Sequence, residues 1–375
     1  MRILMVVSND VVHDPRVLKE ARALREAGHD VACIGWDRSG RGEPYEEREG
    51  LAILRVRTDA VMRALGRDLF RLPLWWRRAR KLAEAQDFDV VHCHDLDTLP
   101  VGVDLKRARG TPLVYDCHEV FGFMIENQVP RFVVDRSFRT ERRLAPQADL
   151  VIAVNDAVKK YIDGVSGGNA VVVRNCNDMV AETFRPPPQP FTIIYLGGLL
   201  RNRFILPAIE VVAQMPDVRL LIGGSGHLTA AVQAACARHP NTRFVGLVPS
   251  DRVFPMTLDA HVVLSMFDPT YRINQVGLPN KIFEAMAAGR PCLVTKGLWM
   301  AELVEREDCG LTVPYSEAGL RDAVERLKAD PALVERLGRN GLAAAKREYN
   351  WDHEKRRLLT EYQDLSGIGR DARNR

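Results

Sequence analysis

The chain has 375 residues, of which 46% are hydrophobic and 27% are charged, a composition typical of a globular enzyme. Its 53 basic and 49 acidic residues leave a net charge of +4. This excess is too small for a nucleic-acid-binding surface, so no nucleic-acid partner is expected, and the length predicts two domains rather than one.

The cysteines and the N-terminus are typical of a cytoplasmic protein. Seven cysteines are scattered without a C-x-x-C pair, which indicates neither a disulfide framework nor a zinc site. The opening MRILMVVSND predicts a strand rather than a signal peptide. No apolar run approaches the ~18 residues that span a bilayer.

Short apolar runs alternate with helical stretches along the first half of the chain. A helix is predicted from about Pro15 to Ala27, where Gly28 ends it. Strands that are apolar throughout, with helices between them, indicate a parallel sheet covered on both faces. We therefore expect a Rossmann-like first domain at residues 1–182. Its predicted strands are Ile3–Val7, Val31–Gly35, Ile53–Val56, Val90–His92, Leu113–Tyr115, Val151–Val154 and Val171–Val173.

A proline-rich segment precedes a second series of the same kind. Residues 185–191, RPPPQPF, cannot continue a helix or a central strand, so they predict a stiff linker. We expect a second doubly wound α/β domain at 183–354, followed by a tail helix that begins at Trp351. In such sheets ligands lie beyond the carboxyl ends of the strands. The strands predicted here are Ile193–Leu196, Arg219–Ile222, Arg243–Val245, Val262–Leu264 and Cys292–Val294.

Polar residues follow the first-domain strands. His118, within YDCHE, suits a hydrogen-bond donor or an acid or base, although most single histidines are only packed. The segment 92–95, HCHD, has the residue types of a metal site, but neighbouring residues of a strand point to opposite faces, so no metal is expected. Asp14 and Arg16 follow the first strand. We expect these two residues either to contact the acceptor or the donor phosphates, or only to start a surface helix.

A basic and aromatic stretch occupies residues 62–83, MRALGRDLFRLPLWWRRARKLA. Arginines beside Trp75 and Trp76 suit an anionic surface, so one hypothesis is peripheral contact with the inner face of the membrane. The alternative is a helix that packs its tryptophans inward and leaves its arginines in solvent.

Glycines follow two strands of the second domain. Gly197 and Gly198 precede Arg201 and Arg203, and two arginines after a glycine turn suit a diphosphate. The alternative is a solvated helix start. The segment 223–226, GGSG, includes Gly224 and Gly226, and it either lets a backbone approach an anion closely or forms a plain tight turn.

The segment 277–291, GLPNKIFEAMAAGRP, predicts a short helix that starts at Pro279 and Asn280 and stops at Gly289. Lys281 and Glu284 are three residues apart, so they share one face near the helix N-terminus. A cation and a carboxylate at a helix end that favours anions suit a ligand with a diphosphate and a diol. A surface ion pair is the plainer interpretation.

Taken in order, these segments resemble family 4 of the retaining glycosyltransferases, which has the GT-B fold of two Rossmann-like domains facing across a cleft. The resemblance covers nearly the whole chain. It rests on the order of the motifs SNDVVHDPRVLKEARALREAGHDV, DVVHCHDLDTLP, PLVYDCHEVF, ADLVIAVN, YLGGLLRNR, LLIGGSG, GLPNKIFEAMAAGRP and YNWDHE.

The resemblance implies sugar transfer from a nucleotide-diphosphate-sugar to a glycan, lipid-linked or small-molecule acceptor, without a metal or other cofactor. Glu284 matches the second glutamate of the family's E-x7-E motif and would bind the donor ribose. Arg203 falls at the diphosphate-binding position, and His118 matches a histidine near the transferred sugar. The tail at about 355–375 would cross back to the first domain.

Three positions depart from the family pattern. Val276 replaces the first glutamate of E-x7-E, Gly198 replaces an arginine, and Phe204 replaces a glycine. A P-x-K-x-x-E version of the motif, here Pro279, Lys281 and Glu284, is similar to that of related members and would supply the missing diphosphate contact. Two alternatives stay open, a nucleotide-sugar 2-epimerase on the same fold and an inactive nucleotide-sugar-binding partner.

Overall fold

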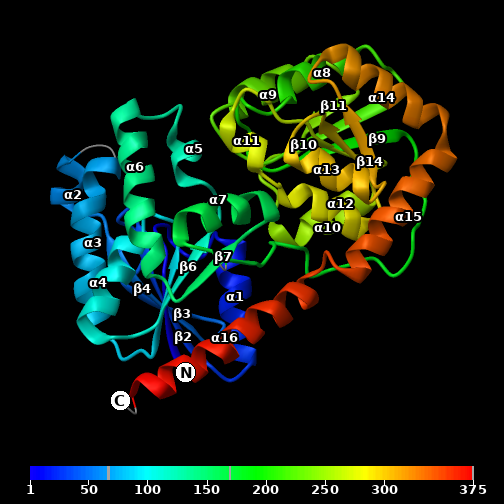
Figure 1. The fold of residues 1–375 in the computed structure, drawn as a ribbon. Helices are drawn as coiled ribbons and strands as arrows, with labels where there is room; N and C mark the ends of the chain where they lie inside the picture. Colours follow the sequence, from blue (N-terminus) through cyan, green and yellow to red (C-terminus); the bar gives the residue numbers. More distant parts are fainter. Residues whose placement is uncertain (66–67, 169, 374–375) are drawn as a thin grey trace. The chain divides into compact units, whose positions relative to one another are not determined.

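The computed structural model describes residues 1–65, 68–168 and 170–373. It divides into two compact units, Met1–Arg174 with Lys355–Arg375, and Asn175–Glu354 (Figure 1). Each unit has its own parallel sheet with helices on both faces, so the predicted α/β class is confirmed. Among the described residues, no helix has both the length and the apolar character needed to cross a membrane.

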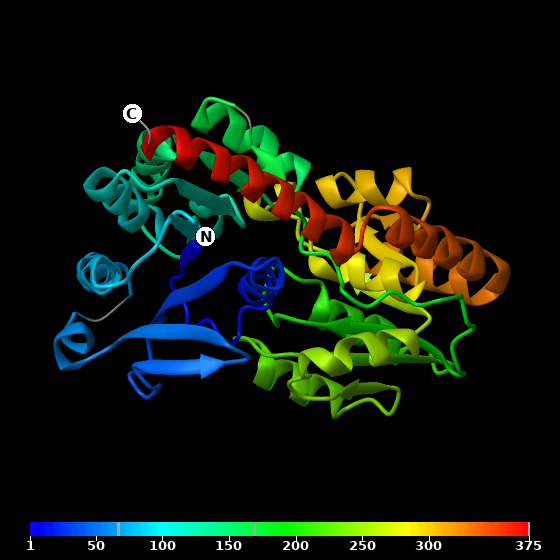
Figure 2. The same cartoon turned by 90° about the horizontal axis from the view of Figure 1, so that it is seen from below.

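The first unit contains an eight-stranded sheet in the order β3-β4-β2-β1-β5-β6-β7-β8. Every strand pair is parallel except β3 with β4, which lie at one edge of the sheet (Figure 2). The strands are β1 (Arg2–Val6), β2 (Asp30–Asp37), β3 (Tyr45–Arg48), β4 (Leu51–Arg57), β5 (Val90–His94), β6 (Leu113–Cys117), β7 (Leu150–Ala153) and β8 (Val171–Val172).

Helices cover both faces of this sheet. Cys93 of β5 faces α4, because a Cβ added to Gly102 of that helix would clash with the Cys93 sulfur. His92 therefore points to the opposite face, where it meets residues of α1 and α16. The helices of this unit are α1 (Pro15–Glu26), α2 (Ala60–Ala64), α3 (Asp68–Glu84), α4 (Leu99–Arg109), α5 (Phe121–Ile125), α6 (Arg131–Leu144), α7 (Asp156–Ser166) and α16 (Trp351–Arg373).

The second unit contains a six-stranded, all-parallel sheet in the order β11-β10-β9-β12-β13-β14. Alternate residues of β9 face two separate apolar cores, because Ile193 and Tyr195 join one core while Ile194 and Leu196 join the other. The strands are β9 (Phe191–Leu196), β10 (Val218–Gly223), β11 (Thr242–Phe244), β12 (Val262–Ser265), β13 (Cys292–Thr295) and β14 (Gly310–Val313).

The helices of the second unit include α12, which begins after Pro279 and ends at Gly289, whose φ of 65° is typical of a helix C-terminus. The stop at Gly289 was predicted from the sequence. The full set is α8 (Ile205–Ala213), α9 (Thr229–Cys236), α10 (Ser250–Leu258), α11 (Arg272–Val276), α12 (Asn280–Ala288), α13 (Trp299–Arg306), α14 (Glu317–Ala329) and α15 (Pro331–Arg347).

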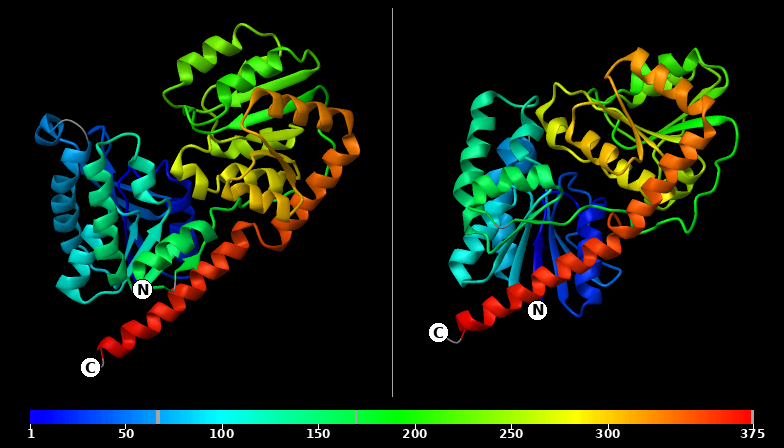
Figure 3. Two further views of the ribbon diagram at one scale, coloured as in Figure 1. Left: turned by 45° about the horizontal axis from the view of Figure 1, so that its top comes forward. Right: turned by 45° about the vertical axis from the view of Figure 1, so that its right-hand side comes forward.

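The boundary between the units lies at 174/175, not at the expected 182/183. The residues after the boundary pack on the second unit, where Cys176 is fully buried in a core and Ala181 N–H donates to the Ala287 carbonyl at 2.8 Å. The proline-rich segment is thus part of the second unit. The tail helix α16 returns to the first unit, as expected (Figure 3). Lys355 of this helix pairs with Glu26 of α1.

Candidate functional site

Two glycine loops of the second unit touch at the carboxyl ends of β9 and β10. Gly197 N–H donates to the Gly223 carbonyl at 2.9 Å, and Leu199 N–H donates to the Ser225 carbonyl at 2.9 Å. Gly224 has a φ of 132°, and a Cβ there would lie 1.9 Å from the Gly197 carbonyl oxygen. Only glycine permits this approach.

These loops line a cavity of about 230 Å³. The cavity brings together four residues proposed from the sequence, Gly197, Gly198, Gly224 and Glu284. Gly226 lies against Leu199 behind the loop, so it supports the cavity rather than lining it. Much of the remaining wall is apolar, because it includes Leu196, Leu247, Val248 and Val253.

Lys281 lies against the first glycine loop. A Cβ on Gly197 would meet its ammonium nitrogen at 2.6 Å, and this nitrogen is 4.7 Å from the centre of the Tyr195 ring. Burial lowers the pKa of Lys281 to about 8, while nearby Glu284 acts to raise it and Arg203 to lower it further. Lys281 and Glu284 therefore form a half-buried pair beside the cavity, not a solvated surface pair.

Arg203 lies near Lys281 and is held in place on two sides. Its guanidinium carbon lies 3.6 Å from the centre of the Phe267 ring, and its Nη1 donates to Asn274 Oδ1 at 2.9 Å. The Tyr195 hydroxyl donates to the Gly198 carbonyl at 2.6 Å. Sequence reasoning missed Tyr195, Phe267 and Asn274; the signal available was the position of Tyr195 two residues before the glycine turn.

The remaining second-domain candidates lie at the edge of this arrangement. Arg201 is exposed, and its backbone N–H donates to His227 Nε2 at 3.2 Å. Asn280 is exposed at the start of α12, and Pro279 precedes it at the N-cap position. Val276 ends α11, where it offers no carboxylate.

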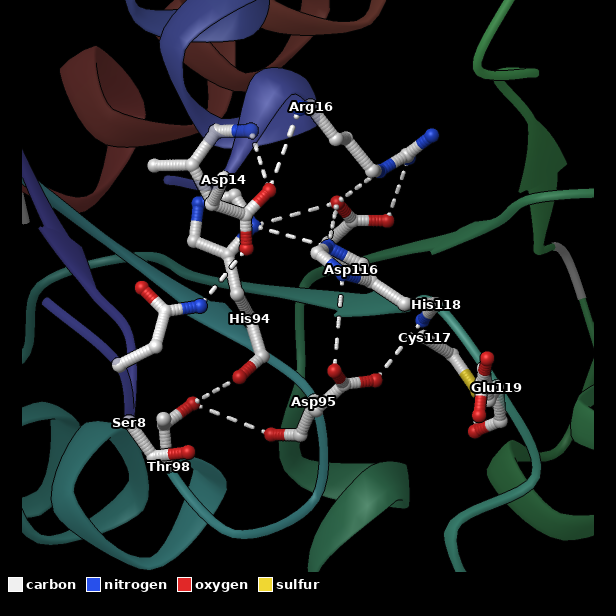
Figure 4. A network of polar contacts seen from close by, with 12 residues as sticks. Ser8, Asp14, Arg16, His94, Asp95, Thr98, Asp116, Cys117, His118 and Glu119 are labelled. Atoms are coloured by element: carbon white, nitrogen blue, oxygen red, sulfur yellow. Dashed lines mark hydrogen bonds and ion pairs between the residues drawn. The ribbon is translucent and has the colours of Figure 1, made fainter. Parts of the chain in front are cut away.

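A second polar cluster lies in the first unit, at the carboxyl ends of β5 and β6 (Figure 4). Asp116 accepts from Arg16 Nε at 2.8 Å and from Arg16 Nη2 at 2.7 Å, and its Oδ2 lies 2.9 Å from His118 Nε2. His94 Nδ1 lies 3.3 Å from the same oxygen. Asp95 Oδ1 accepts the backbone N–H of His118 at 3.0 Å, which holds the histidine from the other side.

The cluster fixes the charge of its members. Burial would lower the pKa of His118, but Asp95 and Asp116 outweigh it and raise this pKa to about 10, so His118 is an imidazolium at neutral pH. Burial would raise the pKa of Asp116, but Arg16 and His118 hold it well below its ordinary value. Burial raises the pKa of Glu20 to about 8, against the opposing effect of Arg16.

The structure places Arg16 in the interior, so the expectation that it faces a ligand is wrong. Its side chain is only 4% exposed, and it also contacts Glu20 at 3.0 Å and the Val173 carbonyl at 2.8 Å. Asp14 caps α1 by accepting the backbone N–H groups of Arg16 and Val17, and it accepts from the Asn9 amide. Both residues therefore organise the loop after β1.

Glu20, His92, His94 and Asp116 are close enough together to ligate one metal ion. The two histidines lie on one face of β5 because they are two residues apart, which the sequence argument about neighbouring residues did not consider. However, the Arg16 guanidinium already contacts both carboxylates at 3.0 and 2.7 Å. A divalent cation would lie beside this guanidinium, so the arrangement suits a buried ion-pair network better than a metal site.

The basic stretch at 62–83 forms α2 and α3, with Gly66 and Arg67 outside the described residues. Trp75 is fully buried and stacks on Trp36 at 5.6 Å, and Trp76 donates to the Asp97 carbonyl. Pro73 lies inside α3. The tryptophans therefore pack inward, as in the alternative interpretation.

Comparison with known proteins identifies the kind of enzyme. The family model described as Glycosyltransferase Family 4 matches residues 16–197, and the model described as Glycosyl transferases group 1 matches residues 190–330. A glycogen synthase of Mycobacterium tuberculosis is 25% identical over 88% of this chain and 85% of that protein. A phosphatidyl-myo-inositol mannosyltransferase of Mycolicibacterium smegmatis is 25% identical over 94% of this chain and 90% of that protein.

Solved structures show the same fold. A sucrose-phosphate synthase of Thermosynechococcus elongatus is similar with a TM-score of 0.81 and 18% identity, over 98% of this chain and all of that chain. Anabaena HepE, solved in complex with UDP-glucose, has a TM-score of 0.72 and 16% identity over 97% of this chain and all of that chain. With the GT-B fold and both family models matched in order, this chain is a glycosyltransferase of the family 4, group 1 type.

Proposed function

We propose that this glycosyltransferase takes its sugar from a nucleotide-diphosphate-sugar bound by the second unit, by a retaining mechanism without a metal. The observation that carries the proposal is the convergence of Glu284 and the two glycine loops on one cavity, with Lys281 lying against the first of these loops. A carboxylate accepts hydrogen bonds from both hydroxyls of a ribose diol. The glycine loops let a diphosphate approach the backbone closely, and a lysine suits its negative charge.

The apolar part of the cavity wall adds a place for the nucleobase. Leu247 is 75% exposed although it is a large apolar residue, and it lines the cavity together with Val248. A flat base packed on these side chains would cover them from water. Binding of UDP and UDP-glucose by HepE, which has the same fold, supports a nucleotide-sugar donor here.

The chemical step breaks the bond between C1 of the sugar and the β-phosphate oxygen. Negative charge grows on the leaving diphosphate, and preorganised cations lower the barrier most. We assign this role to Lys281 and Arg203, aided by the N-terminus of α12. Val276 supplies no nucleophile, so the acceptor oxygen attacks C1 on the face that the phosphate leaves, and the leaving phosphate oxygen takes the acceptor proton.

His118 is proposed to contact the transferred sugar, as the family resemblance implies. Its side chain is 15% exposed, whereas those of His94 and Asp116 are fully buried. Its Nε2 already lies 2.9 Å from Asp116 Oδ2, so as an imidazolium it would donate to a sugar hydroxyl from Nδ1 rather than act as a base.

The acceptor is proposed to be a glycan, a lipid-linked glycan or a small molecule. Peripheral membrane contact stays a proposal, now carried by apolar side chains of α2 and α3 that are exposed, Val61 at 60% and Phe70 at 63%, instead of by the tryptophans. Sedimentation with anionic vesicles at low salt tests it: wild type should pellet and Phe70→Ser should pellet less, whereas a wild type that stays in the supernatant would remove the idea.

Binding and turnover test the donor proposal together. A thermal-shift screen of uridine, guanosine and adenosine diphosphate-sugars should show one that stabilises the protein by about 2.7 kcal/mol at 100 times its dissociation constant. Arg203→Ala and Lys281→Ala should each lower kcat by about 100-fold while the protein stays folded. Full turnover in both variants would show that neither Arg203 nor Lys281 contributes to the reaction.

A further inference from the structure

The segment that follows β12 holds the main chain of Arg203 in place. Arg203 and Phe267 face each other across an isolated antiparallel bridge. On one side of the bridge, Phe204 N–H donates to the Met266 carbonyl at 3.1 Å, and a second backbone hydrogen bond of the same length closes the other side. The position of the Arg203 backbone is therefore set by a segment that lies far from it in the sequence.

Two groups of this segment also hold the Arg203 side chain. Its guanidinium carbon lies 3.6 Å from the centre of the Phe267 ring, so the planar cation stacks on the aromatic face. Its Nη1 donates to Asn274 Oδ1 at 2.9 Å, and to the neighbouring Asn202 carbonyl at the longer distance of 3.2 Å. Stacking fixes the plane of the guanidinium, but only the hydrogen bonds fix its rotation within that plane.

The buried amide of Asn274 can face Arg203 in one way only. Its Nδ2 donates to the Asp268 carbonyl at 2.8 Å, on the side opposite to the bond that Oδ1 accepts. A carbonyl only accepts and a guanidinium only donates, so exchanging the amide oxygen and nitrogen would break both bonds. The hydrogen-bond partners thus determine that an acceptor oxygen points at Arg203.

The segment that carries both groups is itself braced. The Thr295 hydroxyl of β13 accepts the Phe267 N–H at 2.9 Å and donates to the Phe267 carbonyl at 2.8 Å. Asp268 Oδ1 accepts the backbone N–H of Thr270 at 2.9 Å and its hydroxyl at 2.7 Å, which closes a turn before α11. Phe267 and Asn274 are therefore fixed to the second unit, and they form a firm support for Arg203.

We propose that Asn274 is a positioning residue for sugar transfer: it fixes the rotation of the Arg203 guanidinium before the diphosphate is bound. This inference rests on the proposed function, in which Arg203 stabilises the leaving diphosphate. Donors that are already oriented lower the barrier because they do not rearrange while charge grows on the leaving group. As a neutral amide, Asn274 orients the cation without adding a negative charge beside it.

The first test measures the rotation of Arg203 in the wild type. NMR of protein carrying 15N-labelled arginine reports how fast each guanidinium rotates about its Cζ–Nε bond. Arg203 should rotate about tenfold more slowly than Arg201, an exposed arginine of the same loop. Loss of each signal in Arg203→Ala and Arg201→Ala assigns it. Equal rotation rates for the two arginines would overturn the proposal, and this comparison needs no variant at position 274.

Two variants at position 274 separate the acceptor oxygen from the shape of the side chain. Asn274→Leu keeps the shape and removes the acceptor, so Arg203 should rotate about tenfold faster than in the wild type. Asn274→Asp keeps an oxygen that accepts from Arg203, so rotation should stay slow. Unchanged rotation in Asn274→Leu, or fast rotation in Asn274→Asp, would overturn the proposal.

Gln275→Leu is the matched control for these variants. Gln275 is the exposed neighbour of Asn274 on α11, and its Nε2 donates to the Pro269 carbonyl at 3.2 Å. This variant also replaces an amide by an apolar side chain on the same helix, but it should leave both the rotation of Arg203 and turnover unchanged.

Turnover tests whether the orientation of Arg203 matters for the reaction. Asn274→Leu should lower kcat by about tenfold and change KM for the donor little, because the charge that Arg203 stabilises grows in the transition state. In an Arg203→Ala background, Asn274→Leu should cause no further loss, because the side chain that it positions is absent. An equal loss in both backgrounds would mean that Asn274 supports the fold and not Arg203, and would overturn the proposal.

The two kinds of measurement separate this proposal from the proposed function. A wild type that transfers no sugar from any nucleotide-sugar would defeat the proposed function. The rotation rates of Arg203 in the wild type and in the variants at position 274 would still decide whether Asn274 holds the guanidinium.

Discussion

The Lys281 ammonium lies 4.7 Å from the centre of the Tyr195 ring, while the Tyr195 hydroxyl donates to the Gly198 carbonyl at 2.6 Å. One buried side chain at the end of β9 thus supports both the cation and the glycine turn beside the cavity. The ring stabilises a positive charge above its face. The position of Lys281 therefore depends on the sheet and not only on α12.

The pH dependence of donor use should follow the charge on Lys281. Its pKa is lowered to about 8, so the ammonium is present below this pH and is lost as pH rises through it. We expect kcat/KM for the donor to fall about tenfold per pH unit above pH 8. In Lys281→Arg, which keeps its charge, this fall should disappear. Steady-state rates between pH 6.5 and about 9.5 check this, and a wild-type profile that is flat to the upper limit would be evidence against it.

Removing the Glu284 carboxylate should weaken donor binding. Hydrogen bonds to a charged group contribute about 1.5–3 kcal/mol, so Glu284→Gln should lower kcat/KM by roughly 10- to 150-fold. Glu302→Gln is the control, since Glu302 is exposed on α13 and lies outside the cavity wall. Calorimetry measures the donor affinity of both variants. If the two affinities are equal, Glu284 does not bind the donor ribose.

The two glycine loops should differ in their tolerance of a side chain. Gly224→Ala places a Cβ 1.9 Å from the Gly197 oxygen at a φ of 132°, so unfolding should require about 1–3 kcal/mol less free energy than in the wild type. Gly198→Ala meets its nearest atom at 3.5 Å, so its stability should change by less than about 1 kcal/mol. Urea unfolding compares them, and equal midpoints would show that the loops are not in contact as described.

Much of the second-domain site could be predicted from the sequence. The helix over 280–288, the stop at Gly289 and the glycine turns after β9 and β10 follow from local chemistry, which residues close in sequence determine. Tyr195 could not be assigned, because its role depends on α12 lying above the end of β9. The domain boundary was misplaced for the same reason: prolines mark a stiff segment, but only the packing of Cys176 shows to which core it belongs.

Arg16 should be essential to the fold of the first unit rather than to ligand binding. Removing it takes the guanidinium from the buried carboxylate of Glu20 and leaves His118 as the cation beside Asp116, so Arg16→Met should destabilise the protein by about 3–5 kcal/mol. Arg22→Met is the control, because the Arg22–Glu49 pair has side chains 52% and 69% exposed and should contribute less than about 1 kcal/mol. Similar unfolding midpoints would contradict the buried network.

The first-domain cluster was the part that sequence reasoning described least well. His118 could be selected by its place after a strand, but its imidazolium depends on Asp95, Asp116 and Arg16, which come from separate segments. The contact between His92 and Tyr362 joins residues 270 positions apart. No spacing rule connects them, since the path of α16 along the first unit decides which strand residue it meets.

The most direct measurement follows a nucleotide-diphosphate-sugar with its acceptor by 31P and 1H NMR in the presence of EDTA. We expect release of the nucleoside diphosphate, a new glycosidic bond with the anomeric configuration of the donor, and loss of both signals in the double variant Lys281→Ala and Glu284→Ala. An inverted product, or a rate that the double variant does not lower, would contradict retaining transfer from a nucleotide-sugar held by these residues.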